Sequence, residues 1–429
     1  MDDFCTIELF ADNHWTEAAN VSLTGAAAQG VFTPTSSGYG LEYAVAWQNR
    51  RDAHALSSGF PVSLASLDLP HWPVFLIDML PQGYGRQELL RRLGLSENAE
   101  AAGDWPLLLA GAGNPIGNLR IKEAAQWLQR QDGPLHGFTD EEVATRADDF
   151  TEYLARHGLF VAGSSGVQGE WPKILLTRAD DGLLYLDHAL PDERAREHYI
   201  VKFGRGANER LAQILRQEAP YMEIARHLGL RVHARLHMQE RALFIPRFDR
   251  RVDGGKVIRL AQESLAALTG KPGFGQVPTH DEACIRLCEI ASDPLAEICE
   301  YLRRDVANIA LANKDNHARN TAITRDPAGR IGLTPLFDFA PMYLHPDGIS
   351  RRIRWSQHDD GSPDWQAVID SVAGQTGLPR APLLETLQAM ATPLLEVADR
   401  GRDFGLEEDV LAYLQLPLRT HAARLQALH

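Results

Sequence analysis

Two neighbouring segments, NIALANKDNHARNTAI and TPLFDFAP, contain the residues whose types and spacing best fit a chemical task. Asp315 and Asn320 lie five positions apart in a polar run between an apolar helical stretch and an apolar strand-like stretch, and Asp338 follows 18 positions after Asn320. Phosphoryl transfer uses such a trio, because one carboxylate accepts the hydroxyl proton while an amide oxygen and a second carboxylate are hard ligands for Mg²⁺. A plain turn also favours Asn and Asp, but a polar run between two core elements is unusual for one.

Two further segments contain groups that could bind phosphate. The segment GSSGVQG, residues 163–169, precedes a strand-like stretch, and its backbone amides could form an anion-binding nest. Its spacing alone fits a hairpin better, because it matches neither the Walker pattern nor a full dinucleotide fingerprint. Lys202 in HYIVKFG is flanked by apolar residues, where a buried ammonium needs an anion such as an ATP phosphate or Glu218. A solvent-facing lysine is the commoner interpretation of such a position.

A chain of 429 residues is too long for one ordinary hydrophobic core, so more than one domain is expected. The first is an N-terminal domain. Residues 1–125 contain the strand-like runs VFTPTS, GLEYAVAWQ and FPVSLASL. One helix is expected in FLIDMLPQGYGRQELLRRLGL, and a further strand in NPIGNLRI. This order predicts a small α+β domain.

The rest of the chain is expected to form two lobes. Residues 126–252 open with a polar helical connector and continue as a β-rich lobe, in which two helical stretches are separated at Pro220 and end at Gly229. Residues 253–429 are mostly helical. The predicted fold class is therefore α+β, a bilobed protein-kinase-like fold with an additional small N-terminal α+β domain.

Composition restricts the class of protein further. The chain is 44% hydrophobic and 23% charged, as in a folded protein, and its net charge of −14 argues against binding nucleic acid without a partner. No stretch approaches the roughly 18 to 20 apolar residues of a membrane span, and the acidic start MDDFCTIELF does not resemble a signal peptide, so a cytoplasmic location is expected. Four irregularly spaced cysteines predict no disulfide framework, and Cys284 and Cys288 are expected to pack on a core helix.

The order of motifs resembles the HipA-like serine/threonine protein kinase toxins of type II toxin–antitoxin systems, and within them the single-chain YjjJ/HipH-like branch. The run from Asp315 to Asn320 is similar to their D-x-H-x-K-N catalytic loop, and Phe337-Asp338 to their metal-binding element. The remaining similarities follow in family order over residues 20 to 400: FLIDMLPQGYGR, Gly166-Val167-Gln168 with Pro172-Lys173, Lys202, Gln217-Glu218 with Met222, Pro246 to Arg250, and Gln262-Glu263.

The resemblance implies ATP and Mg²⁺ as cofactors and a role for each matched residue. Asp315 would be the catalytic base, Lys202 the contact to the α- and β-phosphates, and Asn320 and Asp338 the metal ligands. The backbones of Pro246 and Phe248 would hold adenine. The full set of implied nucleotide-binding residues is Gly166, Val167, Gln168, Lys173, Lys202, Pro246, Phe248, Asp249 and His317.

Three departures from the family pattern affect regulation and charge. Gly163 stands where a regulatory loop serine is usual, so Ser165 becomes the candidate autophosphorylation residue, with Ser164 as a poorer one. The residues Gly169, Glu170 and Trp171 are inserted before Pro172 and lengthen the loop. Arg319 replaces a lysine, which keeps the charge but loses the compact ammonium.

The resemblance also implies partners. These are a protein substrate, such as a translation factor or an aminoacyl-tRNA synthetase, and a basic DNA-binding antitoxin, with no direct contact to nucleic acid or membrane. Two other classes of function stay open on the residues alone. One is a non-catalytic pseudokinase that holds an antitoxin or DNA-binding partner, and the other is a metal-dependent small-molecule phosphotransferase or nuclease. Magnesium-dependent ATP use and the appearance of new phosphoproteins separate the three.

Overall fold

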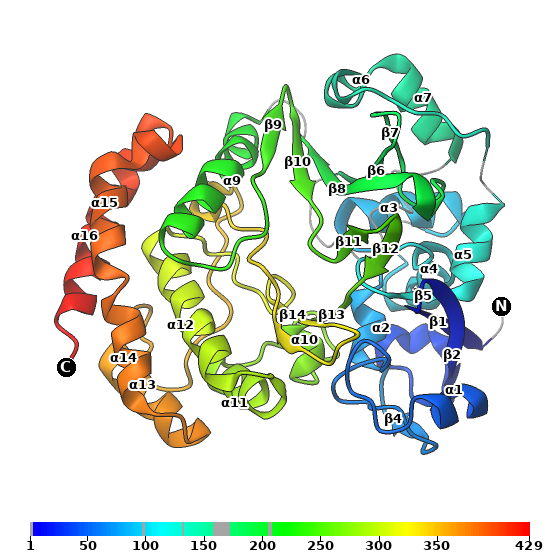
Figure 1. Ribbon diagram of the computed structural model, residues 1–429, viewed down its shortest axis with the longest axis horizontal. Helices are drawn as coiled ribbons and strands as arrows, with labels where there is room; N and C mark the ends of the chain where they lie inside the picture. The colour runs from blue at the N-terminus through cyan, green and yellow to red at the C-terminus, as the bar shows by residue number, and fades with distance from the viewer. Residues whose placement is uncertain (1–2, 97–98, 131–132, 158–171, 205–207) are drawn as a thin grey trace. The chain divides into compact units, whose positions relative to one another are not determined.

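The computed structural model describes residues 3–96, 99–130, 133–157, 172–204 and 208–429 and divides into two compact units (Figure 1). Unit 1 comprises residues up to Arg205 together with Met238–Gln276 and Thr324–Arg330. Unit 2 comprises Gly206–His237, Val277–Ile323 and Ile331–His429. The chain thus passes more than once between the two units.

Unit 1 begins with an antiparallel sheet whose strand order is β4-β3-β2-β1-β5. The hairpin between β1 and β2 turns at Asp12 and Asn13, whose φ angles of 50° and 67° fit the left-handed turn that such hairpins prefer. A core containing Trp72 and Trp105 supports the sheet. The strands are β1 Phe4–Ala11, β2 His14–Leu23, β3 Thr35–Tyr39, β4 Leu67–Leu69 and β5 Leu119–Ile121, and the helices are η1 Ala27–Phe32, α1 Leu41–Ala46, α2 Val74–Asp78, α3 Gly83–Arg92, η2 Ala101–Gly103, α4 Asp104–Gly111 and α5 Lys122–Gln129.

Three predicted elements of this domain are wrong. The run FPVSLASL is not a strand, since only its last residue, Leu67, belongs to one, β4. The run GLEYAVAWQ is not a strand but contains α1, in which Tyr43 and Ala44 are buried while Leu41 and Val45 are exposed. Its Val, Tyr and Trp residues favour strands, but packing of one helical face decided the structure. The single helix expected around Pro81 is two helices, α2 and α3, because proline lacks an N–H and disfavours helical backbone at the preceding residue.

The second sheet of unit 1 has the strand order β7-β6-β8-β10-β9. Its helix α6 begins with a capping box in which Thr139 and Glu142 satisfy each other's backbone N–H groups. The sheet packs on Phe138 and Phe150. The strands are β6 Lys173–Ala179, β7 Leu184–Leu186, β8 Ala195–Phe203, β9 His237–Gln239 and β10 Ala242–Pro246, followed by β11 Arg250–Asp253, β12 Lys256–Arg259 and β13 Ala261–Ser264; the helices are α6 Asp140–Thr145, α7 Asp148–His157, η3 Asp192–Arg194 and α10 Leu265–Leu268.

Unit 2 is mainly helical, and α15 and α16 lie side by side at the left of Figure 1. The strand β14 carries the chain from unit 2 into unit 1. The helices are α9 Glu209–His227, α11 His280–Ile290, α12 Pro294–Ala310, η4 Met342–Leu344, α13 Trp365–Thr376, α14 Arg380–Gln388, α15 Ala391–Arg400, η5 Gly401–Phe404 and α16 Glu408–Gln426, and the strands are β14 Ala322–Arg325 and β15 Ile331–Leu333.

The helix α9 corrects one prediction. Pro220 was expected to begin a second helix, but it lies inside one continuous helix of 19 residues. The proline removes a single backbone hydrogen bond, and burial of Tyr221, Met222 and Ile224 holds the helix together across it. Gly229, with φ at 77°, lies just after the helix, as the sequence predicted.

The cysteines lie as the sequence predicts. Cys284 is buried on α11, and all four cysteines are free thiols. Within the described part of the chain, no helix is both long and apolar enough to cross a membrane.

Candidate functional site

The polar loop of residues 313–320, here called the Asp315 loop, follows α12 and brings two of the predicted residues together. The side-chain amide nitrogen of Asn320 donates to the backbone oxygen of Asp315 at 2.9 Å and to its Oδ2 at 3.3 Å. The Asn320 N–H also donates to the His317 carbonyl at 2.9 Å. Because both side-chain contacts use the amide nitrogen, the Oδ1 atom of Asn320 stays available to accept from or ligate another group.

Two buried asparagines hold the Asp315 loop from within. Asn313 accepts from the Asp315 N–H at 3.4 Å and donates to Asn308 Oδ1 at 2.9 Å. Asn316 accepts from the Arg352 N–H at 2.8 Å and donates to the Ile353 carbonyl at 3.0 Å. The Asp315 carboxylate is 28% exposed, so the loop presents it to solvent on a fixed backbone.

Asp338 belongs to the electrostatic surroundings of this loop. Burial lowers the pKa of His317, while the charges of Asp315 and Asp338 act in the opposite direction. The distance between His317 Nε2 and Asp315 Oδ1 is 3.8 Å. Unit 2 therefore gathers Asp315, His317, Asn320 and Asp338 in one neighbourhood, as the sequence predicted for residues of one task.

The backbone of Asp338 is strained. Its φ angle is 50°, a left-handed value that costs a residue with a side chain on the order of 1 kcal/mol. Anchors on both sides maintain it: the Leu336 N–H donates to the Arg231 carbonyl at 2.7 Å, and the Phe339 ring lies 5.6 Å from that of Tyr221. Such strain is common where a side chain must be aimed for function.

The oxygen donors of this neighbourhood fit a hard cation that takes its remaining ligands from a bound substrate. No group of three or more His, Cys, Asp or Glu side chains placed to hold a metal occurs among the described residues. Mg²⁺ needs no such cage, because it typically binds one or two carboxylates and completes its shell with phosphate oxygens and water. Asp338 and the free Oδ1 of Asn320 are donors of that kind.

Unit 1 contains a pair of buried lysines. Lys173 on β6 and Lys202 on β8 lie directly opposite each other in the antiparallel register, and each is only 3% exposed. Opposite residues point to the same face of a sheet, so the two ammonium groups share one buried environment that favours an anion. The solvent-facing interpretation of Lys202 is therefore wrong.

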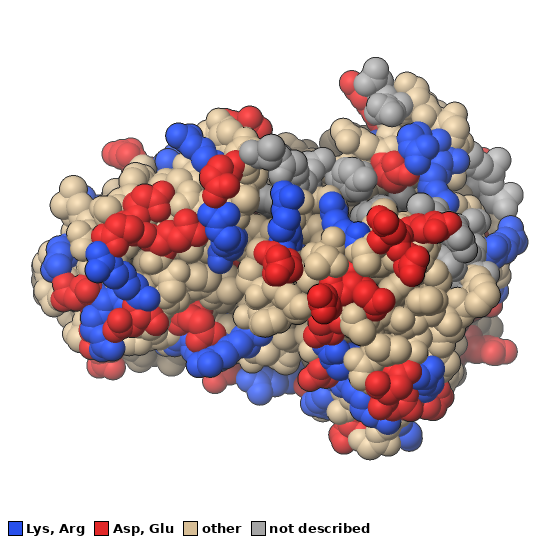
Figure 2. Space-filling view, turned by 90° about the horizontal axis from the view of Figure 1, so that it is seen from above, with Lys and Arg blue, Asp and Glu red and all other residues tan. Residues whose placement is uncertain are grey.

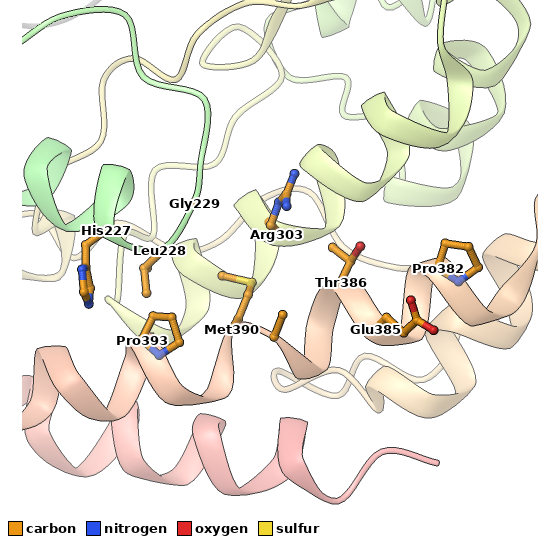
Figure 3. Close-up of a pocket in the computed structure, with 10 residues that line it drawn as sticks. His227, Leu228, Gly229, Arg303, Pro382, Glu385, Thr386, Met390 and Pro393 are labelled. Carbon is orange, nitrogen blue, oxygen red and sulfur yellow. The ribbon is translucent and has the colours of Figure 1, made fainter.

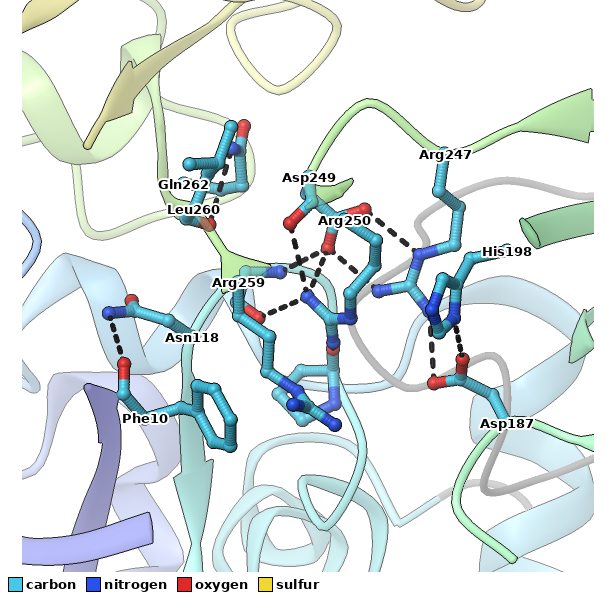
Figure 4. Close-up of polar contacts among 12 residues, drawn as sticks. Phe10, Asn118, Asp187, His198, Arg247, Asp249, Arg250, Arg259, Leu260 and Gln262 are labelled. Carbon is cyan, nitrogen blue, oxygen red and sulfur yellow. Dashed lines mark hydrogen bonds and ion pairs between the residues drawn. The ribbon is translucent and has the colours of Figure 1, made fainter. Parts of the chain in front are cut away.

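The predicted hinge, residues 246–250, is built around a buried carboxylate (Figure 4). Asp249 is 2% exposed and accepts from Arg247 at 2.7 and 2.9 Å and from Arg250 at 2.7 Å. Burial opposes its ionisation, but the two guanidinium groups outweigh burial and hold the pKa of Asp249 below its usual range. Both carboxylate oxygens of Asp249 are thus engaged inside the protein.

The same network extends from the hinge to the N-terminal domain. Arg247 also donates to Asp187 at 3.1 Å, and Asp187 is 2.9 Å from His198. The Gly117 N–H donates to Asp249 at 2.8 Å, and its φ of 96° is one that favours glycine. We call Asp187, His198, Arg247, Asp249 and Arg250 the hinge cluster. Burial and the repulsion of Arg247 lower the pKa of Arg250 to about 9, which shows how crowded with charge the cluster is.

The other predicted residues have varied placements. Pro246 pairs with Tyr199 at the end of β10, and Pro246 and Phe248 are half-buried. The predicted phosphate loop lies outside the described residues, and with it Gly163, Ser164, Ser165, Gly166, Val167, Gln168 and the insertion Gly169 to Trp171. Sequence reasoning missed Asn313 and Asn316, whose only signal was their place in the same polar run.

Two surface features lie apart from these candidates. On the face drawn in Figure 2, acidic and basic side chains are interspersed over short distances. A hollow of about 520 Å³ in unit 2 opens between the end of α9, α12 and the α14–α15 region (Figure 3). None of the candidate residues lines it; its walls are His227, Leu228, Gly229, Arg303, Pro382, Glu385, Thr386, Ala389, Met390 and Pro393.

Comparison with protein families matches residues 165–397, more than half of the chain, to the HipA-like C-terminal domain, and residues 19–122 to the HipA N-terminal domain. No curated protein matches the chain. The predicted domain bounds, 1–125, 126–252 and 253–429, stay a prediction.

Among solved structures, the chain is similar to HipA of Shewanella oneidensis MR-1, solved as a toxin–antitoxin complex with HipB and operator DNA. The identity is 19%, the TM-score is 0.67, and the match covers 99% of this chain and 98% of that one. A second structure, the Helicobacter pylori proinflammatory kinase CtkA, matches at 16% identity and a TM-score of 0.35 over 54% of this chain and 90% of that one. The predicted fold class, an α+β HipA-like kinase fold with an additional N-terminal domain, is confirmed.

Proposed function

Since the chain belongs to the HipA family, we propose that it is an ATP- and Mg²⁺-dependent serine/threonine protein kinase that acts as a growth-inhibiting toxin. The observation that carries the proposal is the Asp315 loop, where Asn320 is tied to Asp315 through its amide nitrogen and Asp338 lies within electrostatic reach. Phosphoryl transfer requires a partly exposed carboxylate as the base and, beside it, oxygen atoms that can bind a metal ion.

In this proposal each residue of the loop has a separate task. Asp315 accepts the proton of the serine or threonine hydroxyl. Asn320 Oδ1 and Asp338 hold Mg²⁺, which neutralises phosphate charge when bound. Burial lowers the pKa of His317 and so favours its neutral form beside Asp315.

The proposed nucleotide contacts belong to unit 1. Lys173 and Lys202 provide the two buried ammonium groups for the phosphates, and the backbones of Pro246 and Phe248 provide an acceptor and a donor for adenine. Gly166, Val167 and Gln168 remain the proposed phosphate loop, with Ser165 ahead of Ser164 as the residue modified. Asp249 is better assigned to positioning the hinge, because its oxygens are already bonded.

The proposed partners follow from the family and from charge. The substrate is a protein, for which a translation factor or an aminoacyl-tRNA synthetase is the expected class. A basic DNA-binding antitoxin would complement the net charge of −14, and the similar Shewanella HipA was solved with HipB and operator DNA. Membership of the single-chain YjjJ/HipH-like branch stays a prediction.

The test is phosphoproteomics of cells that express the wild type or Asp315→Asn, paired with transfer of labelled γ-phosphate by the purified proteins. The matched control is Asp370→Asn, which changes an exposed carboxylate on α13 that pairs with Arg380. New phosphoserine or phosphothreonine in the wild type and the control, absent from Asp315→Asn, supports the proposal. ATP binding without transfer would instead indicate a pseudokinase, and ATP consumption without phosphoproteins a small-molecule phosphotransferase. Broken DNA without phosphoproteins would indicate a nuclease.

A further inference from the structure

The segment Arg351–Ser356 in unit 2 is tied to the Asp315 loop in an extended conformation. Asn316 binds the backbone of Arg352 and Ile353, as described above, and the His280 N–H donates to the Arg354 carbonyl at 3.0 Å. The Ser356 N–H and hydroxyl both donate to Asp281 Oδ2 at 2.7 Å. The Asp315 loop and the start of α11 therefore fix the path of this segment.

Side chains of the segment alternate between the core and solvent, as in a strand with one buried face. Ile353 and Trp355 are 2% and 4% exposed, and the Trp355 indole donates to Asp305 at 2.9 Å. Arg352 and Arg354, which alternate with them in sequence, are exposed. We call this pair of exposed arginines the arginine ledge.

The ledge carries positive charge that is only partly neutralised. Arg354 is 46% exposed and lies 3.8 Å from Asp359, a carboxylate that also pairs with Arg351. Arg352 has no ion-pair partner among the described residues.

The ledge is also close to the proposed catalytic carboxylate. The Arg352 N–H donates to the side-chain oxygen of Asn316 at 2.8 Å, and Asn316 follows Asp315 directly in the chain. An exposed arginine therefore lies on a segment that is hydrogen-bonded to the loop of the proposed catalytic carboxylate, although the net charge of the chain is −14. Exposed positive charge at such a place attracts acidic groups to it.

We propose that the arginine ledge selects protein substrates whose phosphoacceptor serine or threonine is flanked by acidic residues. This inference rests on the proposed kinase function and names its substrate class. Guanidinium groups bind carboxylates through two parallel hydrogen bonds, and a ledge with a fixed backbone loses little freedom when it does so. Two arginines are too few to hold nucleic acid, which requires many neutralised phosphates.

The experiment compares three synthetic peptides that differ only in the residues around one serine: glutamate, glutamine or lysine. Wild-type full-length protein is expected to phosphorylate the glutamate peptide with a KM about tenfold below that of the glutamine peptide. Arg352→Gln should remove that advantage and change the KM for ATP less than twofold, whereas Arg352→Lys should keep part of it. The matched control is Arg419→Gln, which changes an exposed arginine on α16.

Charge reversal at Arg352 distinguishes the loss of a peptide contact from damage to the fold. Arg352→Glu should prefer the lysine peptide over the glutamate peptide, an inversion that a misfolded variant cannot produce. An equal rise in the KM for ATP and for the peptide would overturn the proposal, because the ledge would then neutralise nucleotide phosphates. Equal use of all three peptides by the wild type would overturn it as well.

Failure of the proposed kinase function would be recognised separately. If the wild type transfers phosphate to no peptide, binding of the same fluorescently labelled peptides is measured by anisotropy. Preferential binding of the glutamate peptide, lost in Arg352→Gln, would then retain the ledge as an acidic-peptide site and reject only the catalysis. Equal binding of the glutamate and glutamine peptides would reject the ledge.

Discussion

The hinge cluster of unit 1 and the Asp315 loop of unit 2 both contain ionised side chains, but they use them differently. In the hinge cluster the charged side chains of Asp187, Arg247, Asp249 and Arg250 are at most 3% exposed, and each is paired. In the Asp315 loop the carboxylate is 28% exposed, and Asn320 keeps its amide oxygen unused by Asp315. Charged groups that are buried and paired with one another hold structure, whereas a partly exposed carboxylate beside an unused oxygen donor can perform chemistry.

The two regions also differ in how their backbone conformation affects stability. Asp338 is held at a φ of 50°, which costs stability, whereas Asp249 is held by hydrogen bonds that contribute to it. Substitutions in the two regions should therefore move activity and stability in different combinations.

Asp338→Gly is expected to lower phosphotransfer by at least about 10²-fold, because a proposed metal ligand is removed. The same change should raise the free energy of unfolding or leave it unchanged, since glycine adopts a positive φ without strain. Parallel measurements of phosphate transfer and of thermal unfolding check both parts. Asp338→Asn serves as the control for charge, because asparagine tolerates left-handed backbone. A fully active Asp338→Gly would contradict the assignment.

Arg247→Met is expected to destabilise the protein by about 3 to 5 kcal/mol, since it leaves Asp187 and Asp249 buried with fewer compensating charges. Chemical denaturation followed by circular dichroism measures the change. Arg196→Met is the matched control on β8, because Arg196 is exposed. If Arg247→Met were no less stable than this control, the cluster would have no structural role.

Lys202→Met is expected to raise the KM for ATP about tenfold or more, which corresponds to about 1.4 kcal/mol of binding free energy. Lys173 lies directly opposite Lys202 on the neighbouring strand and is the second ammonium group proposed for the phosphates. Titration of nucleotide against Lys202→Met and Lys173→Met compares the two positions. Unchanged nucleotide affinity in both variants would remove the lysine pair from the proposed site.

The Asp315 loop could be predicted from sequence because its signal is local. Asp315, Asn320 and Asp338 lie within 24 residues, and no distant contact is needed to see their spacing. The same holds for β6 and β8, whose apolar runs are continuous. Local patterns failed where packing decided the outcome, as in α1, which the residues suggest is a strand, and in α9, which continues through Pro220.

The hinge cluster could not be predicted, because its partners are far apart in sequence. Gly117 and Asp249 are separated by 132 positions, and nothing near either residue indicates the other. Asp249 was consequently assigned to nucleotide binding on resemblance alone. Burial of Lys202 was equally hidden, since an apolar flank is compatible with a lysine that faces either way. The arginine ledge likewise depends on Asn316, whose partners Arg352 and Ile353 lie more than 35 positions away.

The smallest effect that we expect is a loss of folding stability at acidic pH. The pKa of Asp249 is lowered in the folded protein, so its ion pairs contribute stability above the ordinary aspartate pKa of about 3.9, and this contribution is lost as the pH falls through the lower folded value. The stability difference between wild type and Asp249→Asn should therefore be constant within about 0.5 kcal/mol from pH 8 to pH 5 and shrink only below about pH 4. Denaturation of both proteins at pH 8, 7, 6, 5, 4 and 3 measures the difference. A change between pH 7 and pH 5 would mean that Asp249 is not held by Arg247 and Arg250 as a fully ionised carboxylate, and the contrast with the open Asp315 loop would lose its basis.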